Sequence, residues 1–412
     1  MKDRVKPERP SFSAVAERRF RLAGKSIIEK GHPYFVPVDK LEQKFASDPD
    51  GYLSLAHYDY LGLSRNPHVL AAGHAAIDAM GSGAGASRLV GGERSTHQAL
   101  ERDMAEFLGA GDVLAMISGY LTNVSLINHL LGPRDLVLID ELAHNSILLG
   151  AKSGRFHCEM FAHNDLDDLE QRLTENRDQY RHVLVVVEGL YSMDGDIPDL
   201  PRLVAMKEAH DAWLLVDEAH SYGVLGATGR GLCEHFDIDP SRVELSVGTL
   251  SKSFVSSGGF ICASKDIISW LRFTLPGFVY SVGLSPTTVA TAHAALNVLR
   301  DEPERVSRLK QKSRLFLDAS VAAGLNPGDA IGEAVVPLMF NSPEQTMMVS
   351  QTLLEAGIYA PPIVQVGVPK DQPRIRFFFS AEHRDQDILR AVDIAAAAAS
   401  GSLPVQIASA DR

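Results

Sequence analysis

The chain has 412 residues, of which 45% are hydrophobic and 22% charged, a globular composition that excludes wholesale disorder and fibrous architecture. Lys and Arg total 40 and Asp and Glu total 52, so the net charge is −12, and the chain lacks the basic footprint that nucleic-acid binding needs. Three cysteines without a CxxC pair indicate a reducing compartment, and we expect a cytoplasmic protein. The charged start and the absence of a sufficiently long apolar run predict neither a signal peptide nor a membrane helix.

The first part of the chain divides into an arm, a helix start and a glycine-rich segment. Residues 1–55 mix charged and apolar side chains, and we expect an N-terminal arm that contains some helix. The dipeptide Asn66-Pro67 is typical of a helix start. The segment Gly81–Gly92 predicts an ordered loop that either approaches a ligand or forms a turn at a subunit interface. Arg88 in this loop could instead form a structural salt bridge at that interface.

Apolar runs alternate with amphipathic segments through the middle of the chain. The segments 96–109 and 200–211 have the periodicity of amphipathic helices. The apolar runs predict buried strands at 113–118, 135–140, 182–190, 212–220, 243–248 and 258–264. This alternation predicts an α/β large domain over residues 56–300, with a mostly parallel sheet and helices on both of its faces.

The last part of the chain has a different pattern. A long charged helix is predicted over 301–324, followed by strand-like segments at 334–340 and 374–382 and a closing alanine-rich helix. These elements predict a smaller α+β domain over residues 301–412.

Polar side chains follow five of the predicted strands, at the edge where parallel α/β sheets bind ligands. Taken singly, each is a helix cap, a turn residue or a solvated charge. Together they include one lysine, Lys252, flanked by hydroxyls, with the acid Asp217 upstream. Pyridoxal phosphate (PLP) requires such a set, because a lysine amine forms its Schiff base, a carboxylate pairs with its ring nitrogen, and hydroxyls and helix N–H groups hold its phosphate. The sequence therefore predicts a PLP site at this edge.

Seven segments carry a resemblance to a known family. DEAHSYGVLG (217–226) and GTLSKSFVSSGGF (248–260), with DYLGL, GAGASRLVGG, SGYLTN, EGLYSMDGD and RIRFFFSAEH, resemble the α-oxoamine synthases, and they span about residues 55 to 385. The resemblance implies a PLP-dependent transferase of fold type I, which is aspartate-aminotransferase-like. It also implies a homodimer with the active site at the subunit interface. The implied acyltransferase reaction condenses an amino acid with an acyl thioester and releases CO2.

The resemblance also implies catalytic roles for residues at the strand ends. Lys252 resembles the Schiff-base lysine that later transfers protons, and Asp217 resembles the partner of the pyridine nitrogen. His220 resembles the group that hydrogen-bonds the phenolic oxygen of the ring. His144 resembles the histidine that stacks on the ring face, although a histidine packed in the core is the alternative. Arg376 resembles the arginine that binds the amino-acid carboxylate, a role that suits a bidentate guanidinium, whereas we expect Arg374 to be structural.

Six further residues resemble cofactor ligands. Thr249 and Ser251 resemble phosphate ligands, and Gly119 and Tyr120 resemble the pair that covers the opposite side of the phosphate. Ser192 resembles a hydroxyl close to the phenolic oxygen. In a separate segment, YSVGLSP, Ser281 is expected to reach the phosphate of the neighbouring subunit, although Gly283 and Ser285 depart from the residues usual in the family.

The substrates are the least determined part of the resemblance, because the PLP ligands are shared by enzymes that use serine, glycine or alanine. Ser251 and Ser253 on either side of Lys252 favour serine. This predicts condensation of L-serine with a long acyl thioester, palmitoyl-CoA or acyl carrier protein, to 3-ketosphinganine in sphingolipid biosynthesis. The alternatives are 8-amino-7-oxononanoate synthase, 2-amino-3-ketobutyrate CoA ligase and 5-aminolevulinate synthase. A second departure is His57-Tyr58-Asp59 before YLGL, where several members of the family have an asparagine.

Overall fold

The computed structural model describes residues 10–22, 34, 52–364 and 372–401. Its centre is a seven-stranded sheet with the strand order β2-β8-β7-β6-β5-β3-β4. The seven strands of this sheet are β2 (Asp112–Met116), β3 (Leu136–Asp140), β4 (His157–Phe161), β5 (Val183–Glu188), β6 (Trp213–Asp217), β7 (Leu245–Thr249) and β8 (Gly259–Ala263). The six strands predicted from apolar runs are all present.

One strand of this sheet runs against the others. β8 is antiparallel to both β2 and β7, whereas β3 through β7 pair in parallel. Only residues 250–258 join β7 to β8, which is too short for the crossover that a parallel pair needs. Because β2 and β7 both oppose β8, they point in the same direction. Five strand ends therefore meet at one edge of the sheet, as the sequence predicts.

Helices cover both faces of the large sheet. Val183, Val185 and Val187 pack in one hydrophobic cluster, and Leu184 and Val186 pack in another, so β5 is buried on both faces. This explains its continuous apolar run. The helices of this part of the chain are α3 (Pro67–Met80), α4 (Ser95–Leu108), α5 (Gly119–Leu130), α6 (Asn145–Ser153), α7 (Leu166–Asn176), α8 (Leu200–Ala209), α9 (Leu232–His235), α10 (Lys265–Thr274), α11 (Pro276–Val279) and α12 (Pro286–Asp301).

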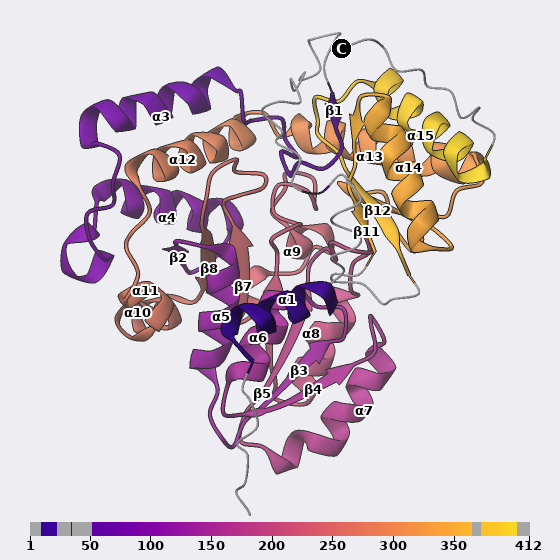
Figure 1. Cartoon of the computed structure of the whole chain (residues 1–412). Helices are drawn as coiled ribbons and strands as arrows, with labels where there is room; N and C mark the ends of the chain where they lie inside the picture. The colour runs from indigo at the N-terminus through magenta and orange to yellow at the C-terminus, as the bar shows by residue number, and fades with distance from the viewer. Residues whose placement is uncertain (1–9, 23–33, 35–51, 365–371, 402–412) are drawn as a thin grey trace, which may run out of the picture.

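A second sheet belongs to the C-terminal part of the chain. It has the order β11-β12-β9, formed by Pro362–Ile363, Arg374–Phe378 and Val335–Met339. Figure 1 shows this sheet beside the helices α13, α14 and α15, apart from β3, β4 and β5. The bounds of these helices are Glu304–Ala322, Pro343–Glu355 and Asp385–Ser400. The fold is thus the predicted α/β architecture, a large domain with a mostly parallel sheet and a smaller α+β domain.

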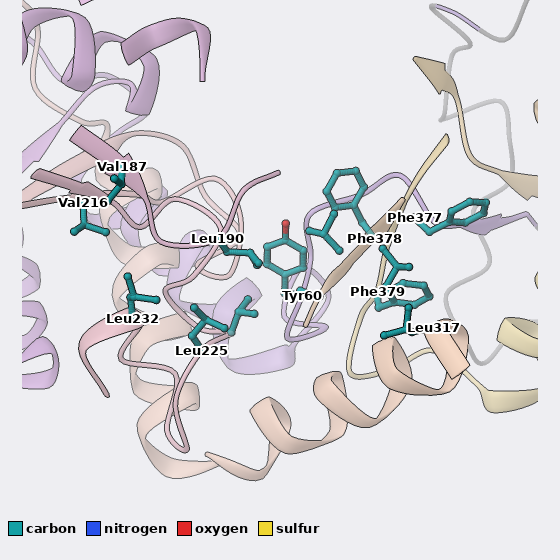
Figure 2. Close-up of a cluster of buried hydrophobic side chains, with 14 of the residues drawn as sticks. Tyr60, Val187, Leu190, Val216, Leu225, Leu232, Leu317, Phe377, Phe378 and Phe379 are labelled. Atoms are coloured by element: carbon teal, nitrogen blue, oxygen red, sulfur yellow. The ribbon is translucent and has the colours of Figure 1, made fainter. Parts of the chain in front are cut away.

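The first strand of the chain joins the C-terminal part. β1 (Leu53–Ser54) pairs in parallel with β10 (Ile358–Tyr359). The amide of Phe378 donates to the carbonyl of Leu55, and that of Ala381 donates to the carbonyl of Tyr60. Figure 2 shows the Tyr60 ring between Leu190 and Phe378, in a hydrophobic cluster that includes side chains of both parts.

Two local predictions can be compared with the N-terminal region. α1 (Phe12–Leu22) supplies the expected helix of the arm, and most of the rest of residues 1–55 lies outside the described residues. Asn66 caps α3 by accepting a hydrogen bond from the amide of His68, as the Asn66-Pro67 signal predicts. Among the described residues, no helix has the length and apolar character needed to cross a membrane.

Candidate active site

The strand ends bring the charged candidates into one site. Besides burial, the positive charge of Arg376 lowers the pKa values of His144, His220 and Lys252, so these groups lie near one another. The negative charge of Asp217 acts in the opposite direction on the pKa values of His144 and Lys252. These groups come from β6, from the loop after β3, from the loop after β7 and from β12, so the large sheet and the small sheet both contribute.

Asp217 is the last residue of β6 and is buried. Its Oδ2 atom accepts a hydrogen bond from Nδ2 of Asn123 at 2.6 Å, and its Oδ1 atom accepts one from the amide of Ala219 at 3.0 Å. Asn123 also donates to Oγ of Ser146 at 3.0 Å. These contacts fix a carboxylate without neutralising it, because neither partner carries a positive charge.

Lys252 lies partly buried in the loop after β7. Burial lowers the pKa of its ammonium group to about 8, although Asp217 and Glu188 act in the opposite direction. Within the described part of the chain, no carboxylate lies at ion-pair distance from its Nζ atom. A neutral amine therefore becomes accessible near physiological pH, which suits both imine formation and proton transfer.

His144 and Glu188 form a second pair at the sheet edge. The amide of His144 donates to Oε1 of Glu188 at 2.6 Å, and Nδ1 of the imidazole contacts Oγ of Ser146 at 2.7 Å. Burial lowers the pKa of His144. Burial and the nearby Asp217 carboxylate raise the pKa of Glu188 to about 8. The histidine ring is therefore neutral and fixed in position, as a group that stacks on a cofactor must be.

His220 is held by a tyrosine from a distant segment. Oη of Tyr60 lies 2.7 Å from Nδ1 of His220, and the imidazole also packs against Phe378. Burial and the cations Lys252 and Arg376 hold the pKa of His220 well below its usual range. Because Tyr60 fixes one ring nitrogen, the other nitrogen remains for a hydrogen bond to a ligand.

The candidate phosphate ligands meet at the start of α5. Oγ1 of Thr249 lies 2.8 Å from Oγ of Ser251 and donates to the carbonyl of Gly258. A Cβ atom at Gly119 would lie 3.0 Å from Oγ1 of Thr249, so glycine keeps the space beside this hydroxyl open. Tyr120 is 43% exposed, and its hydroxyl donates to Oδ1 of Asn145. Hydroxyls beside a helix N-terminus are the partners that a phosphate needs.

The two arginines of β12 differ in their contacts. Nη1 of Arg376 donates to the carbonyl of Ser192 at 2.9 Å, while its buried Nε has no partner in the described structure. Burial lowers the pKa of Arg376. Arg374 is fully buried, and its guanidinium donates to the carbonyl of Met193 and to the carboxylate of Asp194. Arg376 thus retains hydrogen-bonding capacity, and Arg374 holds the loop after β5, as expected for a structural residue.

Two sequence candidates have no contact with this cluster. Within the described ranges the amide of Ser281 donates to the nearby carbonyl of Phe278, and its predicted contact with a neighbouring subunit stays a prediction. Arg88 of the glycine-rich loop is buried and forms ion pairs with Glu93 and Glu101. These ion pairs lie within one chain and give Arg88 a structural role there, while its predicted salt bridge at a subunit interface stays a prediction.

An open cleft leads to Lys252. Its volume is about 1010 Å³, and it is lined by Tyr58, by Lys252 and by residues that follow β12. Residues of the site that are not among the sequence candidates include Tyr60, Asn123 and Ser146. Asn123 lies one helical turn after Gly119, so the SGYLTN motif offered a signal for it, whereas the role of Tyr60 depends on tertiary packing.

The arrangement fits PLP. It combines a lysine without an ion-pair partner, a buried carboxylate, a neutral histidine and a hydroxyl-lined space beside a helix N-terminus. The Oδ1 atom of Asn123, beside Asp217, is buried and has no partner in the described structure. When bound, PLP supplies a sink for the electron pair that remains when a bond to the amino-acid Cα breaks.

Comparison with known proteins defines the class first. The family model for class I and II aminotransferases matches residues 50–394. The 8-amino-7-oxononanoate synthase of Beijerinckia indica is 38% identical over 349 residues, which cover 85% of this chain and 88% of that protein. The 8-amino-7-oxononanoate synthase 1 of Bacillus velezensis is 35% identical over 350 residues, which cover 85% of this chain and 89% of that protein.

A solved structure is similar over almost the whole chain. The serine palmitoyltransferase of Sphingomonas wittichii has a TM-score of 0.86 at 31% identity, covering 95% of this chain and 98% of that one. The chain belongs to the α-oxoamine synthase family of PLP-dependent enzymes. The predicted fold and cofactor are thereby confirmed.

Proposed function

We propose that this chain condenses L-alanine with a pimeloyl thioester and releases CO2, forming 8-amino-7-oxononanoate. The observation that supports this most is the 38% identity to an 8-amino-7-oxononanoate synthase over 349 residues. The three-carbon amino acid and the seven-carbon acyl group lose one carbon as CO2, which leaves a nine-carbon product. The thiol of the donor is the other leaving group.

Each residue of the site has a task in this proposal. Lys252 holds the cofactor, takes the proton from Cα of the amino acid and later returns one. Asp217 stabilises a protonated ring nitrogen, because a buried carboxylate favours a cation beside it. Arg376 binds the amino-acid carboxylate with its free guanidinium donors. His144 covers the ring face, and His220 and Ser192 contact the phenolic oxygen.

The remaining ligands hold the phosphate. Thr249 and Ser251 supply hydroxyls, and Gly119 and Tyr120 lie at the N-terminus of α5, whose amides favour an anion. This assignment also weakens the sequence argument for serine. Oγ of Ser251 contacts Thr249, so the serine before Lys252 has a use that is unrelated to the amino-acid side chain.

Serine palmitoyltransferase activity is the second candidate. It is favoured by the TM-score of 0.86 over 95% of the chain to an enzyme of that name. In this version L-serine replaces alanine and a long acyl thioester replaces the pimeloyl donor. The site residues keep the same tasks, because the two reactions share their chemistry.

A homodimer is also part of the proposal. Tyr280 is 85% exposed and Val282 is 52% exposed, and these apolar side chains flank Ser281. Large exposed apolar side chains on adjacent positions are typical of an interaction surface. We place a second copy of the chain here, with Ser281 reaching the phosphate of that copy.

One panel of assays tests the proposed reaction. The PLP-loaded enzyme is titrated with glycine, L-alanine and L-serine while its visible absorbance is followed. Each amino acid is then paired with acetyl-CoA, pimeloyl-CoA and palmitoyl-CoA, and thiol and CO2 release are measured. We expect L-alanine with pimeloyl-CoA to have the highest kcat/KM. Faster turnover of L-serine with palmitoyl-CoA would select the second candidate, and no thiol release from any pair would refute both.

A further inference from the structure

His144 has a second role in the structure, because it caps the helix α6. It is the N-cap residue of this helix, and its Nδ1 atom accepts a hydrogen bond from the amide of Ser146 at 3.3 Å. Helices usually use a side-chain oxygen for this purpose. An imidazole nitrogen can replace that oxygen only when it carries no proton. The cap therefore requires Nδ1 of His144 to be unprotonated.

The hydroxyl of Ser146 faces the same nitrogen, at the end of a chain of donors that starts at Asp217. A carboxylate only accepts hydrogen bonds, so Asn123 must turn its Nδ2 atom toward Asp217, at 2.6 Å. The same nitrogen donates its second proton to Oγ of Ser146 at 3.0 Å. Because Nδ1 of His144 is unprotonated, the hydroxyl of Ser146 is the donor in their 2.7 Å contact. Two donors thus face Nδ1.

The charges around His144 act on its protonation in both directions. The titratable groups that face this residue from the elements packed around it are Tyr120, Glu188, Asp217, Lys252 and Arg376. The charge of Asp217 favours an imidazolium, whereas those of Lys252 and Arg376 disfavour it. The N-terminus of α6 carries a partial positive charge and disfavours an imidazolium as well.

We propose that Ser146 and Asn123 are positioning residues that hold His144 as the neutral tautomer with its proton on Nε2. The consequence rests on the proposed function, because it concerns the histidine that we propose to cover the cofactor ring. A neutral imidazole can lie over a protonated pyridine ring, whereas an imidazolium would be repelled by it. The same chain of donors reaches Asp217, so one network holds the groups proposed to act on the face and on the nitrogen of the ring.

The chain offers a matched control on the same two helices. Nδ2 of Asn128 on α5 donates to Oγ of Ser153 on α6 at 3.0 Å, which is the same type of bond between the same helices. Ser153 is the last residue of α6, at the opposite end from His144. Ser146→Ala and Ser153→Ala each remove one hydroxyl from α6, and Asn123→Ala and Asn128→Ala each remove one amide from α5.

Nuclear magnetic resonance measures the protonation of His144 directly. The full chain is prepared with isotopically labelled histidine nitrogens and is studied both with and without PLP. The signals of His144 are identified by their loss in His144→Gln. The chemical shifts of the two ring nitrogens show which of them carries the proton, and a pH titration gives the midpoint of protonation. Thermal unfolding checks that each variant is folded.

We expect the proton of His144 on Nε2 in the unmutated chain at neutral pH. Ser146→Ala should raise the titration midpoint of His144 by about 0.5 to 1 pH unit, because the neutral form loses a hydrogen bond. Asn123→Ala should also raise the midpoint, because the hydroxyl of Ser146 is then free to turn and accept a bond from a protonated Nδ1. Ser153→Ala and Asn128→Ala should leave the midpoint unchanged.

Three results would overturn the proposal. These are a proton on Nδ1 in the unmutated chain, an unchanged midpoint in Ser146→Ala, and an equal rise in Ser153→Ala, which would indicate a general effect on α6. If the unmutated chain binds no PLP, the proposed function fails, whereas the spectra of the PLP-free chain still decide whether Ser146 and Asn123 fix the tautomer.

Discussion

Two clusters of buried ionisable residues lie at the same edge of the large sheet. One cluster stabilises the charged form of its cation, whereas the other favours the neutral forms of its lysine and glutamate. In the His163 cluster, Nδ1 of His163 lies 2.9 Å from Asp140 and Nε2 lies 3.0 Å from Asp196. Burial lowers the pKa of His163, but the hydrogen bonds to the two carboxylates outweigh it and raise the pKa to about 10. In the Lys252 site, burial lowers the pKa of Lys252 to about 8 and raises that of Glu188 to about 8.

The difference separates groups that hold the structure from the groups that we propose to react. A cation clamped between two carboxylates keeps its proton over the whole physiological range, so it serves as a fixed link. A lysine and a glutamate whose pKa values both approach neutrality exchange protons at little cost. Variants of the Lys252 site should therefore lose activity and variants of the His163 cluster should lose stability, and the predictions run from the largest expected effect to the smallest.

Removing Lys252, the proposed Schiff-base lysine, should have the largest effect. Lys252→Ala should lower turnover at least about 1000-fold, because both the covalent link to the cofactor and the proton carrier are lost. Borohydride should no longer fix PLP to the protein, which mass spectrometry detects. Lys207, whose Nζ lies 2.6 Å from Glu244, is the paired reference. Lys207→Ala should retain fixed PLP, and fixation of PLP by Lys252→Ala would refute the assignment.

Neutralising the carboxylate of β6 should have the next largest effect. Asp217→Asn should lower turnover about 100-fold, because an amide cannot stabilise a protonated ring nitrogen. PLP should still bind, and the unfolding midpoint should change little. Asp135, which is buried and paired with Arg181 away from the cleft, is the matched control, and Asp135→Asn should affect stability instead. Near-normal turnover by Asp217→Asn would assign ring protonation to another acid.

Breaking the His163 cluster should affect stability. His163→Gln should lower the free energy of unfolding by about 3 kcal/mol, since two buried carboxylates lose their shared cation. The raised pKa means that this contribution is complete below about pH 6.5 and is lost as the pH rises through about 10. Denaturation curves at several pH values should show the gap between the two proteins closing over that window.

The exposed histidine His74 on α3 supplies the control for this experiment. His74→Gln should match the unmutated protein at every pH. A constant gap between His163→Gln and the unmutated protein from pH 6 to 10 would show that the charge of His163 contributes nothing.

The two arginines of β12 differ in the same way, since Arg374 holds the structure and Arg376 is proposed to bind the substrate. Their variants should have the smallest effect. Arg376→Lys should raise the dissociation constant of L-alanine about 10-fold, because an ammonium group cannot make the bidentate contact of a guanidinium. Arg374→Lys should leave that constant unchanged and lower the melting temperature, because Arg374 binds the loop after β5. Absorbance titration and thermal unfolding check both variants, and exchanged phenotypes would reverse the roles of the two arginines.

The sequence predicts the strands that are buried on both faces along nearly their whole length. β5 and β6 are apolar on both faces, so their runs identify them directly. β4 was not predicted, because as an edge strand it has partly exposed positions and no apolar run. The direction of β8 was also not predicted, since nothing in the GGFICAS segment itself distinguishes a parallel strand from an antiparallel one.

The candidate site, too, was only partly predictable from the sequence. Asp217, His220 and Lys252 lie within or just after the C-terminal ends of predicted strands, and the topology then brings them together. Tyr60 and Tyr58 come from a segment that forms no part of the large sheet, so only tertiary structure places them beside His220 and Arg376. The glycine-rich loop was correctly predicted to be ordered, but the ion pairs of Arg88 with Glu93 and Glu101 could not be read from spacing alone.

The pairing of β1 with β10 determines how late during translation the cleft can be completed. Leu53 pairs with Ile358, so 305 residues separate the two partners along the chain. At about 5–20 residues per second, a ribosome needs roughly 15–60 s to make that interval. Until then Tyr58 and Tyr60 have no strand to dock on, and the rest of the large sheet can form without them. The cleft is therefore completed after translation of its last strand, and a chain released before residue 358 would carry Lys252 without an assembled site.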